Sequence, residues 1–95
     1  MKITASFPTQ RGPALMGTMA KHFGHKIPVI SSDTSALFDF QDGTATLAVT
    51  ATGLALDIEA PTPNLIARLR GVIESHLIRF AHREDPQPLI WTDPA

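Results

Sequence analysis

The sequence predicts an α+β domain, with a four- to five-stranded antiparallel sheet and two helices on one face. Three observations indicate this class. Several short segments alternate apolar and polar residues, two longer segments carry apolar residues at helical spacing, and their order is strand, helix, four strands, helix. A chain of 95 residues suits one domain, because a chain of this size buries roughly 60–65% of its unfolded surface. We therefore assign residues 1–95 to a single domain.

The first two elements are a half-buried strand and an amphipathic helix. Residues 2–7 alternate, and Pro8 stops the strand. Thr9 is expected to cap a helix that carries Pro13 in its first turn, and Gly24 is expected to end it in a left-handed conformation. The apolar stripe of this helix consists of Leu15, Met16, Met19, Ala20 and Phe23.

Four strands should follow, as an antiparallel meander with one apolar and one polar face. Pro28 interrupts the first of them, which favours an edge position. Asp42-Gly43 predicts a type I′ hairpin turn, because this pair accepts positive φ angles. The expected strands cover residues 27–31, 36–41, 46–51 and 54–59.

A long second helix is predicted from Thr62-Pro63, a capping hydroxyl followed by proline, to about Arg83. Pro86 and Pro88 end it. Residues 89–91 then add a strand or fold back onto the core. The resulting order β-α-β-β-β-β-α is similar to the TATA-binding-protein-like two-layer sandwich. This comparison concerns shape, and shape does not transfer function.

Composition argues against several functional classes. A formal net charge of −1 removes any global electrostatic case for binding nucleic acid or an anionic membrane surface. The chain has no cysteine, so a thiolate site or a cysteine nucleophile is excluded. No apolar run approaches the ~20 residues of a membrane span, and residues 1–10 do not resemble a signal peptide. We expect a soluble, cytoplasmic protein.

All four histidines lie in two short segments with cationic neighbours, HFGHK at residues 22–26 and HLIRFAHRE at residues 76–84. Helical phase separates those of the second segment. His76 falls inside the apolar stripe, Arg79 lies on its margin and Arg83 lies at the helix end. His82 points away from the stripe and should be solvated.

A metal site is one interpretation of these histidines. His22 and His25 flank Gly24, and zinc or iron would take His76 as the third ligand, with Glu84 as a possible carboxylate. The spacing lacks the strictness of an HExxH helix.

A structural interpretation stands beside the metal site. Both segments end helices, where cationic side chains gain ~0.3–1 kcal/mol each from the macrodipole. This favours structural roles for His22, His25 and His82. For His76 both interpretations remain open, because an imidazole on an apolar stripe requires a partner.

At these same residues the chain resembles an uncharacterised bacterial family, the domain of unknown function 2218. The resemblance covers TASFPT, KHFGHKIPV, GTATLAV, HLIRFAHRE and the later Trp91. It implies a small protein that is free-standing or joined to siderophore-interacting flavoproteins, with an accessory role near iron acquisition. No flavin domain is expected in this chain, and the cysteine expected shortly before the HF pair is missing. The residues that the resemblance singles out are His22, Phe23, Lys26, His76, Arg79, Phe80 and Glu84.

Three functions follow as hypotheses. The first is a non-enzymatic binding domain that joins His76 with His22 or His25. Its cationic groups suit an anionic ligand, such as a carboxylate-rich chelate or its ferric complex. The ligand-binding candidates are His76, Arg79, Lys26 and Arg83.

The second hypothesis is an interaction module whose open sheet face pairs with a second copy or with a partner, such as a siderophore-interacting flavoprotein. The third is an enzyme with His76 as general base, which ranks last because no nucleophile stands out.

Overall fold

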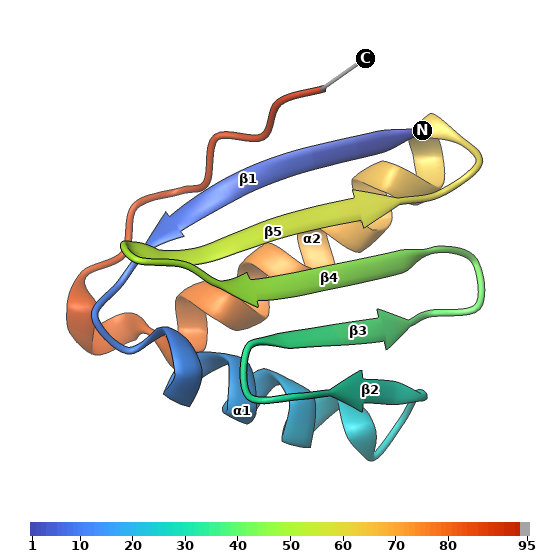
Figure 1. Cartoon of the computed structure of the whole chain (residues 1–95). Helices are drawn as coiled ribbons and strands as arrows, with labels where there is room; N and C mark the ends of the chain where they lie inside the picture. The colour runs from blue at the N-terminus through green and yellow to red at the C-terminus, as the bar shows by residue number, and fades with distance from the viewer. Residues whose placement is uncertain (94–95) are drawn as a thin grey trace.

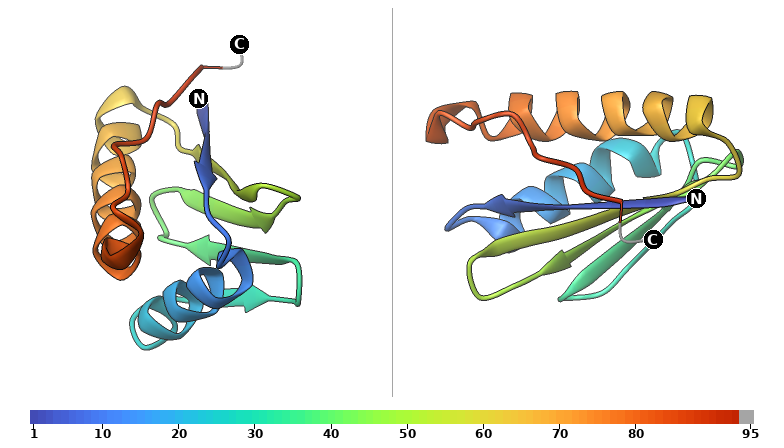
Figure 2. Two further views of the ribbon diagram at one scale, coloured as in Figure 1. Left: turned by 90° about the vertical axis from the view of Figure 1, so that its left-hand side faces the viewer. Right: turned by 90° about the horizontal axis from the view of Figure 1, so that it is seen from above.

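The computed structural model of the chain describes residues 1–93 and shows a five-stranded antiparallel sheet with two helices on one face (Figures 1 and 2). This confirms the predicted architecture. The elements are β1 (Lys2–Pro8), α1 (Gly12–Gly24), β2 (Val29–Ser31), β3 (Ser35–Asp39), β4 (Thr44–Val49), β5 (Gly53–Glu59), α2 (Pro63–Phe80) and the short 3-10 helix η1 (His82–Glu84).

The strand order β1-β5-β4-β3-β2 places β1 and β2 at the two edges of the sheet. Since side chains alternate along a strand, one face carries the apolar set that packs under the helices. The large side chains that are fully buried there are Phe38, Leu15, Met19, Leu47, Leu54, Ile58, Ile73 and Leu77. On the opposite, open face the register aligns one row across the sheet: Ile30, Leu37, Thr46, Asp57 and Thr4.

Helix α2 begins as predicted and ends earlier than predicted. The Thr62 hydroxyl accepts the Leu65 N–H at 3.2 Å, and Pro63 occupies the first helical position. The helix ends at Phe80, whereas the prediction extended it to about Arg83. The chain tightens into η1 before Asp85 turns it with a φ of 52°. Residues 81–83 therefore lie in a turn and in η1, outside α2. No change in apolar periodicity marks this boundary in the sequence.

Both predicted ends of the first helix need correction. Helix α1 starts at Gly12 with Arg11 as the N-cap, and Arg11 makes no side-chain capping bond. The Thr9 hydroxyl instead accepts the Arg11 N–H at 3.0 Å, just outside the helix. Gly24 is the last helical residue and does not have a positive φ. The chain leaves through His25, at φ −78° and ψ −12°, so no left-handed residue is required.

The turn after β3 is not the predicted type I′ hairpin. Gln41, at φ 73°, takes the left-handed position, and the Asp42 N–H donates to the Phe40 carbonyl at 2.8 Å. This is a three-residue γ-turn. Asp39 supports it by accepting the Gln41 N–H at 2.9 Å. Gly43 is required because β5 approaches it closely: a Cβ there would lie 2.6 Å from the carbonyl oxygen of Glu59.

The segment after η1, residues 85–93, crosses the outer edge of β1 and is called the C-terminal tail below (Figures 1 and 2). Leu89 is buried in the core. Thr92 pairs with Thr4 through two backbone hydrogen bonds of 2.8 Å. Of the two alternatives predicted for residues 89–91, folding back onto the core is confirmed by Leu89, whereas no strand forms there and the backbone pairing is an isolated bridge at Thr92. No helix within residues 1–93 is long and apolar enough to cross a membrane.

Candidate functional site

Two of the four histidines, His22 on α1 and His76 on α2, lie side by side where the helices cross. Their ring centroids are 5.0 Å apart. Phe23 touches both, with its ring centroid 5.1 Å from His22 and 4.9 Å from His76. Phe80 lies one turn beyond His76 and 5.6 Å from His22. The histidines thus belong to a cluster of rings built by both helices.

This ring cluster continues into the core. Phe23 packs edge-on against Phe38 at 5.7 Å and against Phe40 at 5.6 Å. Such edge-on pairs contribute about 0.5–1.5 kcal/mol each beyond the area they bury. The two histidines are half-buried and form the outer end of the cluster. Part of their role is therefore structural, as the alternative interpretation predicted.

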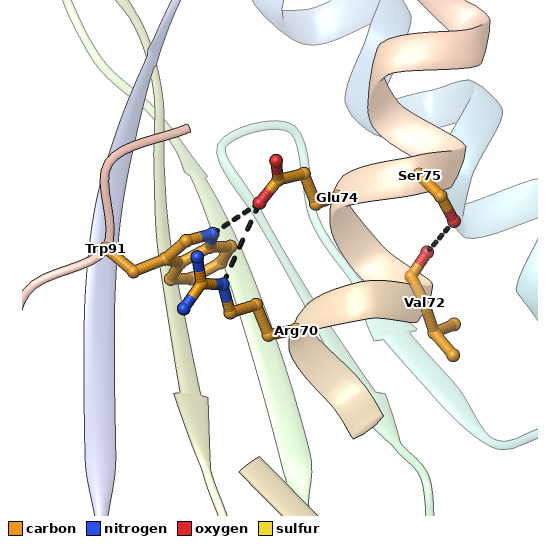
Figure 3. Close-up of polar contacts among 5 residues, drawn as sticks. All are labelled: Arg70, Val72, Glu74, Ser75 and Trp91. Carbon is orange, nitrogen blue, oxygen red and sulfur yellow. Dashed lines mark hydrogen bonds and ion pairs between the residues drawn. The ribbon is translucent and has the colours of Figure 1, made fainter. Parts of the chain in front are cut away.

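The polar atoms of His76 are partly satisfied within its own helix. Its Nδ1 lies 2.7 Å from the Val72 carbonyl oxygen, which also accepts the Ser75 hydroxyl at 3.2 Å (Figure 3). A carbonyl can only accept, so Nδ1 carries the proton in this contact. The second ring nitrogen, Nε2, is then the one left for a ligand or a proton.

His22 lacks such a partner. Its Nε2 is buried and makes no hydrogen bond within the described residues. Burial lowers the pKa of His22 below its usual 6.5, and repulsion from His76, Lys26, Arg79 and His25 lowers it further. The uncharged imidazole is therefore the favoured form near neutral pH.

The cations around His22 are not neutralised by acids. Lys26 and Arg79 are exposed, and within residues 1–93 neither forms an ion pair within 4.0 Å. The Arg79 guanidinium carbon lies 5.5 Å from the centroid of the Phe80 ring, a cation–π distance. Positive charge thus accumulates beside the two histidines, and no carboxylate within residues 1–93 forms an ion pair with Lys26 or Arg79.

The remaining predicted residues lie outside the ring cluster. His25 and Arg83 are exposed. His82 is exposed, as predicted, and its Nδ1 lies 3.0 Å from the Arg79 carbonyl oxygen. Among residues 1–93 no group of three or more histidine, cysteine, aspartate or glutamate side chains is placed to hold a metal. The predicted three-ligand site of His22, His25 and His76 is therefore not assembled in this part of the chain.

Two long-range polar contacts escaped the sequence analysis. The Thr9 hydroxyl donates to Glu84 Oε1 at 2.6 Å across 75 positions of sequence, and Glu84 Oε2 is buried and makes no hydrogen bond within residues 1–93. The Trp91 indole N–H donates to Glu74 Oε1 at 2.7 Å, with Arg70 Nε 4.0 Å from the same oxygen (Figure 3). No local pattern signals either contact. The sequence singles out Glu84 only as a possible metal ligand and through the family resemblance, and it does not predict the contact of Glu84 with Thr9.

Fold and paired histidines together define a small two-layer α+β domain whose helices meet at a cationic ring cluster. The chain belongs to the family described as "Uncharacterized protein conserved in bacteria (DUF2218)", whose sequence profile matches residues 4–92. Its fold is similar to that in "NMR structure of PA4090 from Pseudomonas aeruginosa", with a TM-score of 0.77 and 22% identity over 99% of this chain and 95% of that one. A search of curated proteins found no match.

Proposed function

We propose that this protein is a non-enzymatic binding domain for an anionic ligand. The site is the cationic histidine cluster, which we define as His22, Lys26, His76 and Arg79. The observation that carries this proposal is the uncompensated polar chemistry of the cluster. Within residues 1–93, a buried imidazole nitrogen without a hydrogen-bond partner lies among Lys26 and Arg79, which form no ion pair there.

Each part of the cluster suits an anion. Arg79 offers a planar fork of donors that matches a carboxylate, and Lys26 offers a compact charge. His76 Nε2 and His22 Nε2 can donate once protonated, and an anion favours the protonated forms because it attracts them. Binding should therefore strengthen as the pH falls toward and below 6.5, the ordinary pKa of histidine.

We place the ligand among carboxylate-rich chelates or their ferric complexes, because several carboxylates can engage several cations at once. In that proposal the protein serves iron utilisation as an accessory domain, and its implied partner is a siderophore-interacting flavoprotein. The cluster contributes charge and donors to the chelate, and the chelate supplies every metal ligand.

Citrate and ferric citrate test this proposal, with ¹⁵N-labelled protein observed by NMR at pH 6 and pH 8. We expect saturable shifts in the His22 and His76 side-chain signals, and tighter binding at the lower pH. The double variant Lys26→Gln/Arg79→Gln should weaken binding by roughly two- to fivefold for each exposed charge pair lost.

The matched control is Lys2→Gln/Arg68→Gln, which removes the same formal charge away from the cluster. It should bind as the unaltered protein does. Equal weakening by both double variants would show a response to net charge alone. The absence of saturable shifts at the histidines would reject the site.

A second candidate function is protein–protein interaction through the open sheet face. Ile30 on β2 and Leu37 on β3 are paired across the strands on this face, and they are 72% and 36% exposed. Adjacent exposed apolar side chains favour an interface, here between two copies of the chain. Sedimentation equilibrium should then show a dimer that Ile30→Ser dissociates. A monomer at millimolar concentration would reject this candidate.

A further inference from the structure

A cavity of about 800 Å³ lies between the open sheet face and the C-terminal tail, away from the cationic histidine cluster. Its floor includes Thr4 and Ser6 of the edge strand β1 and Ala55 of β5, and the tail forms its outer wall with Leu89 among the lining residues. Its size falls in the range of roughly 300–1,000 Å³ that is usual for small-molecule sites. Two contacts hold this wall in place. Thr92 of the tail pairs with Thr4 on β1, and Trp91 of the tail donates a hydrogen bond to Glu74 on α2.

The charges that line this cavity all have one sign. Asp57 from β5, Glu84 from η1 and Asp85 from the tail contribute carboxylates. Among the described residues that line it there is no lysine, arginine or histidine. Apart from the amide of Gln87, the rest of the lining is hydroxyl-bearing or apolar. The cavity lining is thus negatively charged, whereas the surroundings of His22 are positively charged, so the two sites require different ligands.

Glu84 adds an acceptor that the fold leaves unfilled. Its Oε1 accepts the Thr9 hydroxyl, which fixes the side chain, while its Oε2 is buried and makes no hydrogen bond within the described residues. Buried polar atoms in native proteins are nearly always hydrogen-bonded, so an exception calls for a partner. The carboxylate also sits where two cavities meet, since it lines the neighbouring one at the start of α1 as well.

We propose that this cavity binds an organic ammonium ligand with an apolar body. The ammonium group would lie beside the carboxylates of Glu84 and Asp85, and the body would cover Ala55 and Leu89. Asp57 adds negative charge further along the cavity, because it pairs with Thr4 on β1 whereas Glu84 lies against Thr9 beyond the end of that strand. An anion is disfavoured by three like charges. A chelated metal is disfavoured because residues 1–93 hold no suitable group of three ligands. This site stands independently of the proposed function.

The test uses pentylamine as the probe and 1-pentanol as its uncharged counterpart, with amide shifts of the ¹⁵N-labelled full chain as the readout. We expect pentylamine to give saturable shifts at Ser6, Ala55 and Asp57 in the millimolar range, and 1-pentanol to give none. A lysine residue blocked at both ends carries the same ammonium group on a peptide. Tighter binding of that compound than of pentylamine would assign the ligand to a protein side chain, and the reverse would assign it to a free amine.

Two substitutions neutralise the site without changing its shape. Glu84→Gln should raise the Kd for pentylamine by roughly two- to fivefold, as for a partly exposed charge pair, and Asp57→Asn, further along the cavity, should raise it less. Glutamine can still accept the Thr9 hydroxyl, so the fold is preserved. Asp33→Asn is the control, because Asp33 is exposed in the turn before β3 and lies outside the cavity. Equal binding of 1-pentanol, no saturable shift, or an equal loss in Asp33→Asn would each overturn the proposal.

Discussion

At the scale of single residues, His22 joins packing to charge. Its ring contacts Phe23, Phe80 and His76, so its position is set by the helix crossing. The same crossing withdraws Nε2 from solvent and brings cations close. His22 therefore completes the ring cluster, and its pKa depends on the charges around that cluster.

We predict that His22 titrates below 6.5 in the folded protein and that Lys26→Gln raises its pKa, because one repelling cation is removed. The unfolded chain then binds the proton more readily between the folded pKa and 6.5. Consequently the free energy of unfolding falls as the pH falls through this window, and the full value is present above 6.5. Histidine ring signals followed by NMR against pH measure this directly.

The exposed Lys2 supplies the comparison, since it is not among the groups that shift the pKa of His22. Lys2→Gln should leave the titration of His22 where it was. A pKa of His22 at or above 6.5 in the unaltered protein would contradict the cluster as described.

At the scale of elements, α1 contains a glycine whose backbone freedom the fold does not require. Gly17 lies in an exposed part of the helix, and a Cβ placed on it meets no atom within 4 Å. Gly12, by contrast, starts the helix against the sheet, where a Cβ would lie 3.0 Å from the Gly53 carbonyl oxygen. Of these two glycines in α1, only Gly12 is required by a close contact.

Replacing Gly17 by alanine should stabilise the protein by about 0.5–1 kcal/mol, because alanine loses less backbone freedom when the helix forms. Urea unfolding should show a higher midpoint with an unchanged m-value. Gly12→Ala should give no such gain, since its methyl group would press on β5. A gain of equal size in both variants would show that the contact at Gly12 is not limiting.

Periodicity predicted which elements form, and local chemistry decided where they end. The strands and both helices follow from alternation and helical spacing in the sequence. The exit of α1 through His25 and the γ-turn at Gln41 do not, because each depends on backbone bonds to Phe23 or Phe40 that a residue pattern does not encode. Thr62 was predictable because its cap acts within its own helix.

The candidate site followed the same division. The phase of α2 identified His76 as the histidine that needs a partner, and the Val72 carbonyl provides one. The sequence does not predict the burial of His22 Nε2, because that burial depends on how α1 crosses α2. Contacts across long separations in sequence, such as Thr9 with Glu84, depend on the complete fold.

At the scale of the whole molecule, the C-terminal tail joins the two layers. Trp91 binds Glu74 on the helix layer, Thr92 pairs with Thr4 on the sheet, and Leu89 enters the core between them. Ile90, in contrast, is 82% exposed. The tail is therefore held at separate points, with the cavity beneath it.

We predict that Trp91→Phe loosens the tail without unfolding the domain, since it removes the indole donor to Glu74 and keeps an aromatic ring. The loss should be about 1–2 kcal/mol, as for a partly exposed hydrogen bond to a charged group. Hydrogen exchange should then become faster at the amides of Thr4 and Thr92, which bond each other's carbonyls.

Amides inside the sheet, such as that of Leu47, provide the internal reference and should keep their protection. Faster exchange throughout the sheet would instead show that the indole bond supports the whole domain. An unchanged rate at Thr4 would show that the Thr92 pairing holds without Trp91.

The pairing of Thr4 with Thr92 has a consequence for how the molecule behaves in a crowded solution. A free sheet edge is a template on which other chains can stack into aggregates. Here β2 is only three residues long and follows Pro28, and β1 is crossed by the tail. Both edges of the sheet are thus poor templates. The two backbone bonds between Thr4 and Thr92 therefore help to keep copies of this protein from polymerising.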